Sequence, residues 1–359
     1  MARPRKCSGG KRRWTERLRQ AWLALAPFGL LLFLTGCVRT DGVKMTRTKM
    51  TPTEPSSPTE PSSLTEPSSL TESSSLFELL AEARRASRDT FLTPTEDRWA
   101  ELYRWAQQAG GAEPPEAPSG FERHATNEDG VFLFTEKSPT GAGAFLMRDR
   151  GAPVVVEVPH SFFDRHTLQI GLALFRAIPA RAMIVNTAHR YRGAGCASSS
   201  GCASSSPKAC PSDVVRNATT LFHAVHRGWT ERSSSRPAVV ALHGYRQGAS
   251  EPQVLLSSAG TEFPLSGVVQ ALRSEFQIWR ADPRFVREEP SQFVATYPHE
   301  ITRLGGVKGV QAAHVRSLNG YFLHVELGRT LRDFLAIDRK QRASFALALA
   351  NAVRRELGP

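Results

Sequence analysis

The order of apolar and polar positions divides the chain into stretches of different character. From about residue 120 onward, short runs of β-branched and aromatic residues alternate with longer amphipathic stretches of helical spacing. The short runs predict strands at residues 131–135, 144–148, 153–158, 182–187, 237–242, 253–258, 277–280 and 321–327. The amphipathic stretches predict helices at residues 166–178, 212–229, 264–275 and 329–356. This alternation is typical of an α/β domain with three layers, αβα, built around a mostly parallel mixed sheet.

Two further amphipathic stretches precede the alternating region. They predict helices at residues 76–88 and 95–108, and Thr95 has the side chain expected of an N-cap for the second. We therefore divide the folded part into a helical preface, residues 76–118, and an α/β domain, residues 119–359.

The first 37 residues have the pattern of an export signal. Eight Arg and Lys residues and a single Glu lie within residues 1–20, and 14 apolar residues follow at 21–34. That run is shorter than the roughly 20 residues a membrane-spanning helix needs, and it is typical of a secretory signal peptide. It ends in Leu34-Thr35-Gly36-Cys37, which looks like a bacterial lipobox. We therefore expect Cys37 to be lipidated and to become the new N-terminus.

This lipobox predicts a protein anchored by acylated Cys37 to a lipid bilayer of the bacterial cell envelope, periplasmic or at the cell surface. An uncleaved membrane anchor is the alternative. Twin-arginine export, for which Arg12-Arg13 would be the signal, is a second alternative, although the residues around the pair fit that signal poorly.

A tether is predicted between the signal and the folded part. From Thr53 the sequence repeats every six residues as TEPSSP, TEPSSL, TEPSSL and TESSSL. One apolar residue in six cannot offset the entropy lost on folding, and Pro and Ser favour extended, solvated chain. We therefore expect residues 38–75 to form a disordered linker.

Most of the net positive charge lies in the predicted signal peptide. The whole chain carries a formal +12, which alone would suggest a nucleic-acid partner. The eight basic residues and one acid of the signal account for +7, so residues 38–359 carry only +5 and we expect no nucleic-acid partner. Hydrophobic residues at 40% and charged residues at 22% exclude wholly disordered, collagen-like and coiled-coil classes. The sequence leaves the oligomeric state open.

Three predicted strands end in side chains that suit metal chemistry. His160 and Asp164 follow the third strand, His243 follows the fifth, and Glu326 lies near the end of the last. Carboxyl ends of parallel strands meet at one edge of a sheet, so these side chains are expected to lie together. A catalytic zinc takes three protein ligands and a water, and two histidines with a carboxylate are a common set. We predict one zinc ion held by His160, Asp164 and His243, with Glu326 as the base toward its water.

These motifs resemble the N-formylglutamate amidohydrolase-like proteins, within the wider zinc carboxypeptidase-like, or phosphorylase/hydrolase-like, fold. The resemblance rests on VPHS at 158–161, LHG at 242–244 and HVELGRTLR at 324–332, and spans roughly residues 150–335. It implies a zinc hydrolase of an amide bond, often one next to a carboxylate. It also implies that His160 and His243 are metal ligands, Glu326 a general base and Arg329 a charged neighbour.

The chain departs from the family pattern at two places. The carboxypeptidase pattern H-x-x-E has Phe163 where the glutamate should stand, so Asp164, one position later, or Glu157, three positions before His160, is the third ligand. The family's S-R-Y segment with a following D-x-N-R is replaced by Thr-Ala-His-Arg-Tyr at 187–191, which argues against N-formylglutamate itself as the substrate.

Several other polar residues are candidates for substrate contact. Arg190, Arg246 and Arg329 can each bind a substrate carboxylate bidentately, or alternatively form ion pairs within the domain. Asn319, in the turn dipeptide Asn319-Gly320 before the last strand, is a further candidate. Loops at 297–299 and 305–306 are expected at the mouth of the site.

A cysteine-rich insertion lies beside the predicted site. Residues 193–210 hold Cys196, Cys202 and Cys210, which in an oxidising envelope predict one disulfide, with all three pairings open. A three-cysteine metal site is the less favoured alternative, because no further ligand lies nearby.

Two functions follow from these observations. The first is a membrane-tethered, zinc-dependent hydrolase of an amide bond in an N-acyl amino acid, a peptide or a cell-wall fragment. The second, suggested by the imperfect metal motif, is a non-catalytic envelope lipoprotein that keeps the fold and binds a ligand or partner.

Overall fold

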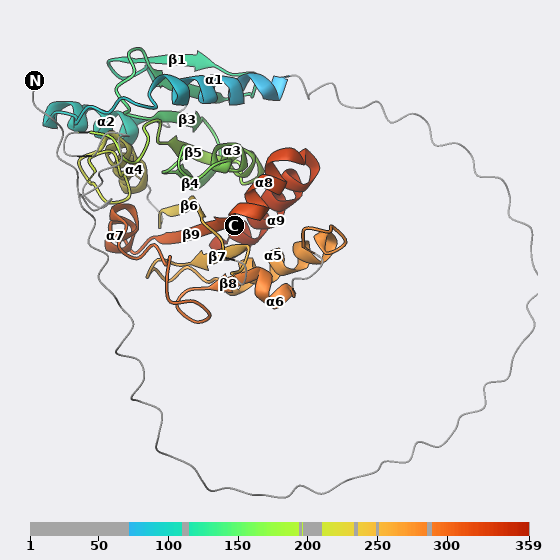
Figure 1. Ribbon diagram of the computed structural model, residues 1–359. Coiled ribbons are helices and arrows are strands. Elements are labelled where there is room, and N and C mark those ends of the chain that lie inside the picture. The colour runs from blue at the N-terminus through green and yellow to red at the C-terminus, as the bar shows by residue number, and fades with distance from the viewer. Residues whose placement is uncertain are drawn as a thin grey trace, which may run out of the picture. The chain divides into compact units, whose positions relative to one another are not determined.

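A single mixed sheet forms the middle layer of the fold (Figure 1). The computed structural model describes residues 72–109, 115–193, 196, 210–232, 236–248, 251–285 and 289–358. The predicted signal peptide, Cys37 and the predicted linker as far as residue 71 lie outside these residues. Among the described helices, none combines the length and the apolar character needed to cross a bilayer.

Within the described residues, nine strands join in the order β1-β2-β3-β5-β4-β6-β9-β7-β8. The four central strands β5, β4, β6 and β9 run parallel, whereas β1, β2 and β3 are antiparallel additions, and β7 reverses direction against β9. The strands are β1 (Phe121–Ala125), β2 (Val131–Glu136), β3 (Ala144–Arg148), β4 (Ala152–Val158), β5 (Ala180–Val185), β6 (Ala238–Tyr245), β7 (Val254–Ser257), β8 (Val294–Thr296) and β9 (Tyr321–Gly328).

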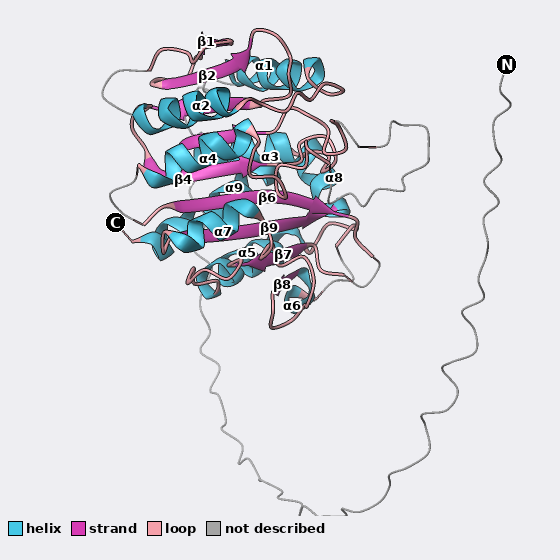
Figure 2. Ribbon diagram, turned by 90° about the vertical axis from the view of Figure 1, so that its left-hand side faces the viewer, coloured by secondary structure: helices cyan, strands magenta, loops and turns pink. Residues whose placement is uncertain are grey.

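Helices cover both faces of this sheet, which confirms the predicted three-layer αβα architecture. Figure 2 shows α2, α4 and α7 lying across one face, while α1, α3, α5, α8 and α9 contribute to the core on the other. The helices are α1 (Glu72–Ala86), α2 (Glu96–Gln108), α3 (Thr167–Ala177), α4 (Leu221–Glu231), α5 (Ser266–Trp279), α6 (Pro290–Phe293), α7 (Val310–Ser317), α8 (Arg329–Ile337) and α9 (Arg339–Leu357).

The alternation of side chains along β4 shows how the two faces are separated. Val154, Val156 and Val158 are buried against α3 and its neighbours, whereas Val155 and Glu157 face the layer of α2, α4 and α7. Both faces of a central strand are therefore buried, which is why these strands read as nearly continuous apolar runs.

Three of the predicted elements differ from the structure, and β1, β8 and α7 were not predicted. The predicted strand 277–280 is wrong, because these residues end α5, where Phe276 and Trp279 continue the buried helical stripe of Leu272. The predicted helix 329–356 is broken in two at Asp338, which caps α9 by accepting a hydrogen bond from the amide of Gln341. The predicted helix 212–229 begins only at Leu221, and the residues before it form turns.

The two helices predicted before the alternating region are present as α1 and α2. Thr95 caps α2, with its side chain accepting a hydrogen bond from the amide of Arg98, as predicted. Helix α1 begins at Glu72, so its first residues overlap the end of the predicted disordered linker.

Candidate metal centre

Three neighbouring parallel strands bring the predicted metal-site residues to one edge of the sheet. Strand β4 ends immediately before the turn that carries His160, while His243 and Glu326 lie in β6 and β9 and are paired in register. Their α-carbons are therefore about 5 Å apart across the strand pair. The strands are rigid and buried, so they fix the directions in which these side chains point.

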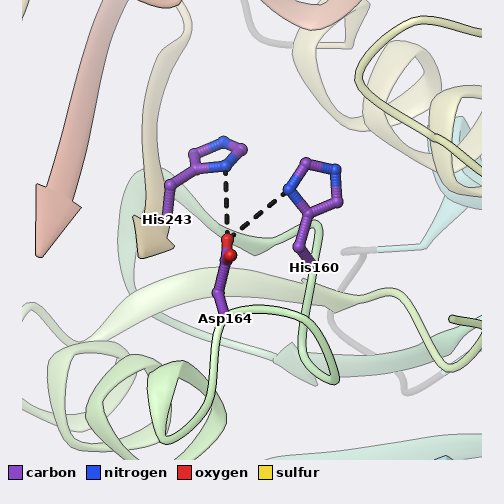
Figure 3. A group of neighbouring side chains, drawn as sticks. All are labelled: His160, Asp164 and His243. Atoms are coloured by element: carbon purple, nitrogen blue, oxygen red, sulfur yellow. Dashed lines mark ion pairs between the residues drawn. The ribbon is translucent and has the colours of Figure 1, made fainter. Parts of the chain in front are cut away.

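Asp164 lies between two imidazoles. Its Oδ2 is 3.5 Å from Nδ1 of His160 and 3.7 Å from Nδ1 of His243. All three side chains are buried, and one donor atom from each lies within 4.8 Å of the others. Figure 3 shows the carboxylate of Asp164 pointing toward both rings.

This donor set fits a zinc ion. Zinc bonds to His nitrogen and Asp oxygen are about 2.0–2.2 Å long, so two ligands of a tetrahedral ion are about 3.3–3.5 Å apart. The separations around Asp164 are close to that value. In addition, the buried Oδ2 of Asp164 has no hydrogen-bond donor among the described residues. A buried anionic oxygen without a donor is costly, and a cation at this position would compensate it.

A second carboxylate orients His160. Its Nε2 is 3.0 Å from Oδ1 of Asp213, while Oδ2 of Asp213 accepts a hydrogen bond of 2.8 Å from Arg190. A metal-binding histidine characteristically donates its other ring N–H to a carboxylate, which fixes its tautomer and orientation. Asp213 thus leaves Nδ1 of His160 free to face Asp164.

The two histidines differ in protonation. Burial, together with the neighbouring His324 and His160 rings, lowers the pKa of His243 well below its usual value, so that it is a neutral imidazole. Burial also opposes a charge on His160, but the neighbouring carboxylates of Asp164 and Asp213 outweigh it and raise the pKa of this residue. Asp213 is held as a carboxylate, since His160 and Arg190 lower its pKa despite its burial.

Glu326 has one occupied and one free oxygen. Its Oε1 is 3.2 Å from Nε2 of His324, whereas its Oε2 is buried and has no hydrogen-bond partner within the described part of the chain. The ring of His324 in turn lies against that of His243, with centroids 4.5 Å apart. The free oxygen is the one available to accept a proton.

A cavity of about 500 Å³ opens over these residues. His160, Asp164, His243, His324 and Glu326 all line it. The loops at 297–299 and 305–306 were expected at the mouth of the site, and Tyr297, Gly305 and Gly306 line the cavity.

Cations surround the same cavity. Arg190 pairs with Asp213 and Arg303 with Glu251, but Arg216, Arg246 and Lys308 have no carboxylate partner among the described residues. This excess of positive charge favours an anionic ligand.

Other predicted residues lie elsewhere. Asn319 lies at the amino end of β9, the edge of the sheet opposite to the site, in a left-handed turn with a φ of 52°. Arg329 begins α8, is largely exposed and pairs with Asp333, and it does not line the cavity. Glu157 faces α4 and its Oε1 is 2.6 Å from Nδ1 of His226, so Asp164 is the carboxylate that lies with His160 and His243.

The site residues that were not predicted include Asp213, His324, Arg216 and Lys308. Asp213 lies in turns that were predicted as part of a helix because of their apolar spacing. The one sequence signal for its contact with His160 is its position next to the cysteine-rich insertion. His324 shares a face of β9 with Glu326, and the two-residue spacing could have indicated their contact. No sequence signal distinguishes Arg216 from other surface arginines.

The insertion beside the site contains a disulfide, as predicted. It joins Cys196 to Cys210, whereas Cys202 lies outside the described residues. At its base, the amide of Arg192 donates to Oγ of Ser212, and that hydroxyl donates to the carbonyl of His189. These bonds hold the segments of Arg190 and Asp213 side by side.

Comparison with known proteins gives only distant similarities. No family model and no curated protein sequence matches the chain. A structure titled YndL in its zinc-free apo form shares 13% identity with a TM-score of 0.34, covering 63% of this chain and 92% of that one. N-formylglutamate amidohydrolase from Ralstonia eutropha shares 16% identity with a TM-score of 0.33, covering 60% and 99%. A metallo-carboxypeptidase from Burkholderia cenocepacia shares 11% identity with a TM-score of 0.35, covering 74% and 70%.

The proteins that the sequence motifs resemble are thus among the solved structures similar to this chain. These likenesses are too distant to indicate a function, which must be inferred from the site itself.

Proposed function

We propose that this protein is a zinc-dependent hydrolase of an amide bond, anchored to the bacterial cell envelope through acylated Cys37. The observation that carries the proposal is the cluster of His160, Asp164 and His243, buried and spaced for a tetrahedral zinc ion, in the same cavity as the free oxygen of Glu326. An ion held by these residues would support hydrolysis, because all three line the cavity and a water and a substrate could reach it there.

Metal binding, proton transfer and positioning fall to different residues of the site. His160 and Asp164 lie on one turn and His243 on β6, so the three would hold the metal from two directions. Bound zinc acts as a Lewis acid that polarises a carbonyl and lowers the pKa of water. Glu326 accepts the proton at Oε2 and can return it to the leaving amine, while His324 holds Oε1 in place.

The substrate is an amide with a carboxylate or another anionic group near the bond that is cleaved. Arg216, Arg246 and Lys308 line the cavity without a carboxylate partner in the described part of the protein, so they are free to bind such a group. This charge distribution suits an N-acyl amino acid, a peptide terminus or an acidic cell-wall fragment.

Metal analysis of the purified full-length chain, carrying no histidine tag, tests the proposal. We expect about one zinc per chain, removed by chelation and absent from the His160→Ala/His243→Ala double variant. Glu326→Gln keeps the shape of the base and should retain zinc while losing hydrolysis of a panel of N-acyl amino acids and peptides by about 10²–10⁴-fold.

Each outcome of this experiment has a distinct meaning. Zinc binding with full hydrolysis in Glu326→Gln would contradict the assignment of the base alone. A chain that binds no zinc, and whose stability is indifferent to chelator, would contradict the enzyme and favour a ligand-binding lipoprotein of the same fold.

A further inference from the structure

The loop that carries two of the three donor atoms is held from a distant part of the chain. Residues 159–164, here called the metal loop, join β4 to the turn before α3 and contain both His160 and Asp164. The guanidinium of Arg84, in α1, donates from Nη1 to the backbone carbonyl of Ser161 over 2.8 Å, although the two residues are 77 positions apart. It also lies over the ring of Phe162, 4.7 Å from its centre.

Both contacts of Arg84 fall between the two metal-binding residues. Ser161 and Phe162 directly follow His160 and precede Asp164, so the backbone that Arg84 holds is the backbone that sets the spacing of the donors. Arg88, one turn further on in the chain, lies on the same ring at 6.0 Å.

The rest of the metal loop is fixed from the other side. Ser161 is fully buried and its hydroxyl donates to the carbonyl of Asn186, whose side-chain amide donates to the carbonyl of Pro159. Within the loop, the amide of Asp164 donates to the carbonyl of His160. Among the described contacts, those of Arg84 are the ones that tie this loop to α1.

Helix α1 is itself firmly placed. Leu76 and Leu80 are buried in the core together with Leu133 and Leu146 of β2 and β3. Because the helix is anchored on the sheet, its arginine is a fixed point and not a mobile surface charge. Arg84 is partly buried, and its Nε is enclosed without a hydrogen-bond partner in the described residues.

We propose that Arg84 is a positioning residue for the metal loop: it holds Ser161 and Phe162 so that His160 and Asp164 face one metal ion. The proposal rests on the zinc site of the proposed function. It makes α1 part of the site scaffold, although its sequence suggested only a helical preface. Groups that orient metal ligands typically contribute 10–100-fold in metal affinity.

A zinc titration of the purified full-length chain, in competition with a chromogenic chelator, tests the proposal. Arg84→Met keeps a long apolar side chain but removes the donor and the charge, and we expect the Kd for zinc to rise about tenfold or more. Arg84→Lys keeps one donor without the planar stacking and should have an intermediate Kd.

Arg85 provides a matched control on the same helix. It is exposed and its side chain makes no hydrogen bond or ion pair within the described residues, so Arg85→Met removes the same charge one position away. We expect its Kd for zinc to equal that of the wild-type chain. Thermal unfolding of each metal-free protein identifies the temperature range in which all variants are folded, and the titrations are made there.

The outcomes separate this inference from the proposed function. No zinc binding by the wild-type chain would overturn the zinc site itself. Zinc binding by the wild type with an unchanged Kd in Arg84→Met would overturn only the role of Arg84. Should Arg84→Met fail to fold, Phe162→Leu removes the ring from the other side of the contact, and an unchanged Kd in that variant would equally overturn the proposal.

Discussion

A buried acid and a buried histidine form a pair behind the metal centre. Glu157 on β4 and His226 on α4 are almost fully enclosed, and Oε1 of the one is 2.6 Å from Nδ1 of the other. Burial raises the pKa of Glu157 from 4.5 to about 8 and lowers the pKa of His226 from 6.5 to about 3. At neutral pH the pair is therefore a neutral carboxylic acid donating its proton to a neutral imidazole.

The pair makes stability depend on pH in a defined window. Between pH 4.5 and 6.5 the folded pair carries one proton, on Glu157, and the unfolded pair also carries one, on His226, so their effects on stability cancel. Between pH 6.5 and about 8 the folded pair keeps its proton while the unfolded chain has none, so stability falls as pH rises. The loss is about 1.4 kcal/mol for each pH unit, or about 2 kcal/mol over this window.

Glu157→Gln removes this dependence. The glutamine amide can still donate to His226 but does not titrate, so we expect the fall of about 2 kcal/mol between pH 6.5 and 8 to disappear. Urea unfolding at a series of pH values measures it. The same fall in the variant as in the wild type would mean that another group is responsible.

The site residues in a strand or directly after one could be predicted from the sequence, whereas those that arrive from distant segments of the chain could not. His160, His243 and Glu326 stand in or directly after apolar runs, where the direction of a side chain follows from the strand. Asp213 reaches His160 from a turn 53 residues away, and Arg84 reaches the metal loop from a helix face. Such contacts depend on tertiary packing, and no local pattern in the sequence indicates them.

At the scale of elements, the segment between β8 and α7 shapes the cavity. It returns across the face of the sheet, and its Gly306 lies against the ring of His324, where a β-carbon would approach within 2.7 Å. Gly306 also has a φ of +66°, which favours glycine.

Gly306→Ala should therefore be costly for two reasons. The left-handed backbone costs roughly 1–2 kcal/mol for a residue with a β-carbon, and displacing the packed ring costs about 1–3 kcal/mol more. Gly120→Ala is a control with a similar φ of +69°, where the nearest atom is the end of the flexible Arg98 side chain. Urea unfolding should show a larger loss of free energy in Gly306→Ala, and equal losses would contradict the close packing on His324.

Helices and strands were predicted correctly where their hydrophobic pattern, helical or alternating, continued over the whole element. The central strands and α2 and α3 lie close to their predicted bounds, because their burial is continuous. The predicted strand 277–280 was wrong because Ile278 and Trp279 have strand-forming side chains in a helix whose stripe begins at Val268. Strands β1 and β8 were missed, since one is mostly exposed and the other has three residues.

At the scale of the whole molecule, the predicted anchor can be tested separately from the site. Cells fed a labelled fatty acid should attach it to the wild-type chain, which should also lose residues 1–36, whereas Cys37→Ser should be unlabelled and keep its signal. Cys7→Ser is the matched control, because Cys7 lies in the part that is removed. An unlabelled wild-type chain with an intact N-terminus would instead indicate an uncleaved membrane anchor.

The overall architecture was predictable because alternating strands and helices permit few arrangements. The reversal of β7 against β9 was not, since a short apolar strand has the same pattern in either direction. That reversal matters for the site, because β7 leads the chain away from the carboxyl ends of β6 and β9. Residues 302–309, which lie between β8 and α7, then complete the lining of the cavity.

The candidate metal donors and most of the cationic groups lie on different segments of the chain. This arrangement has a consequence for how such a protein can change over generations. The candidate donors stand on β6 and on the turn that Arg84 of α1 contacts, whereas Arg216, Arg303 and Lys308 stand on other segments that line the cavity. Replacing Arg303 or Lys308 would alter the charge presented to an incoming molecule, because both line the cavity without belonging to the donor set. Substitutions in the lining segments can thus change which ligand fits the cavity while the candidate donor set is retained.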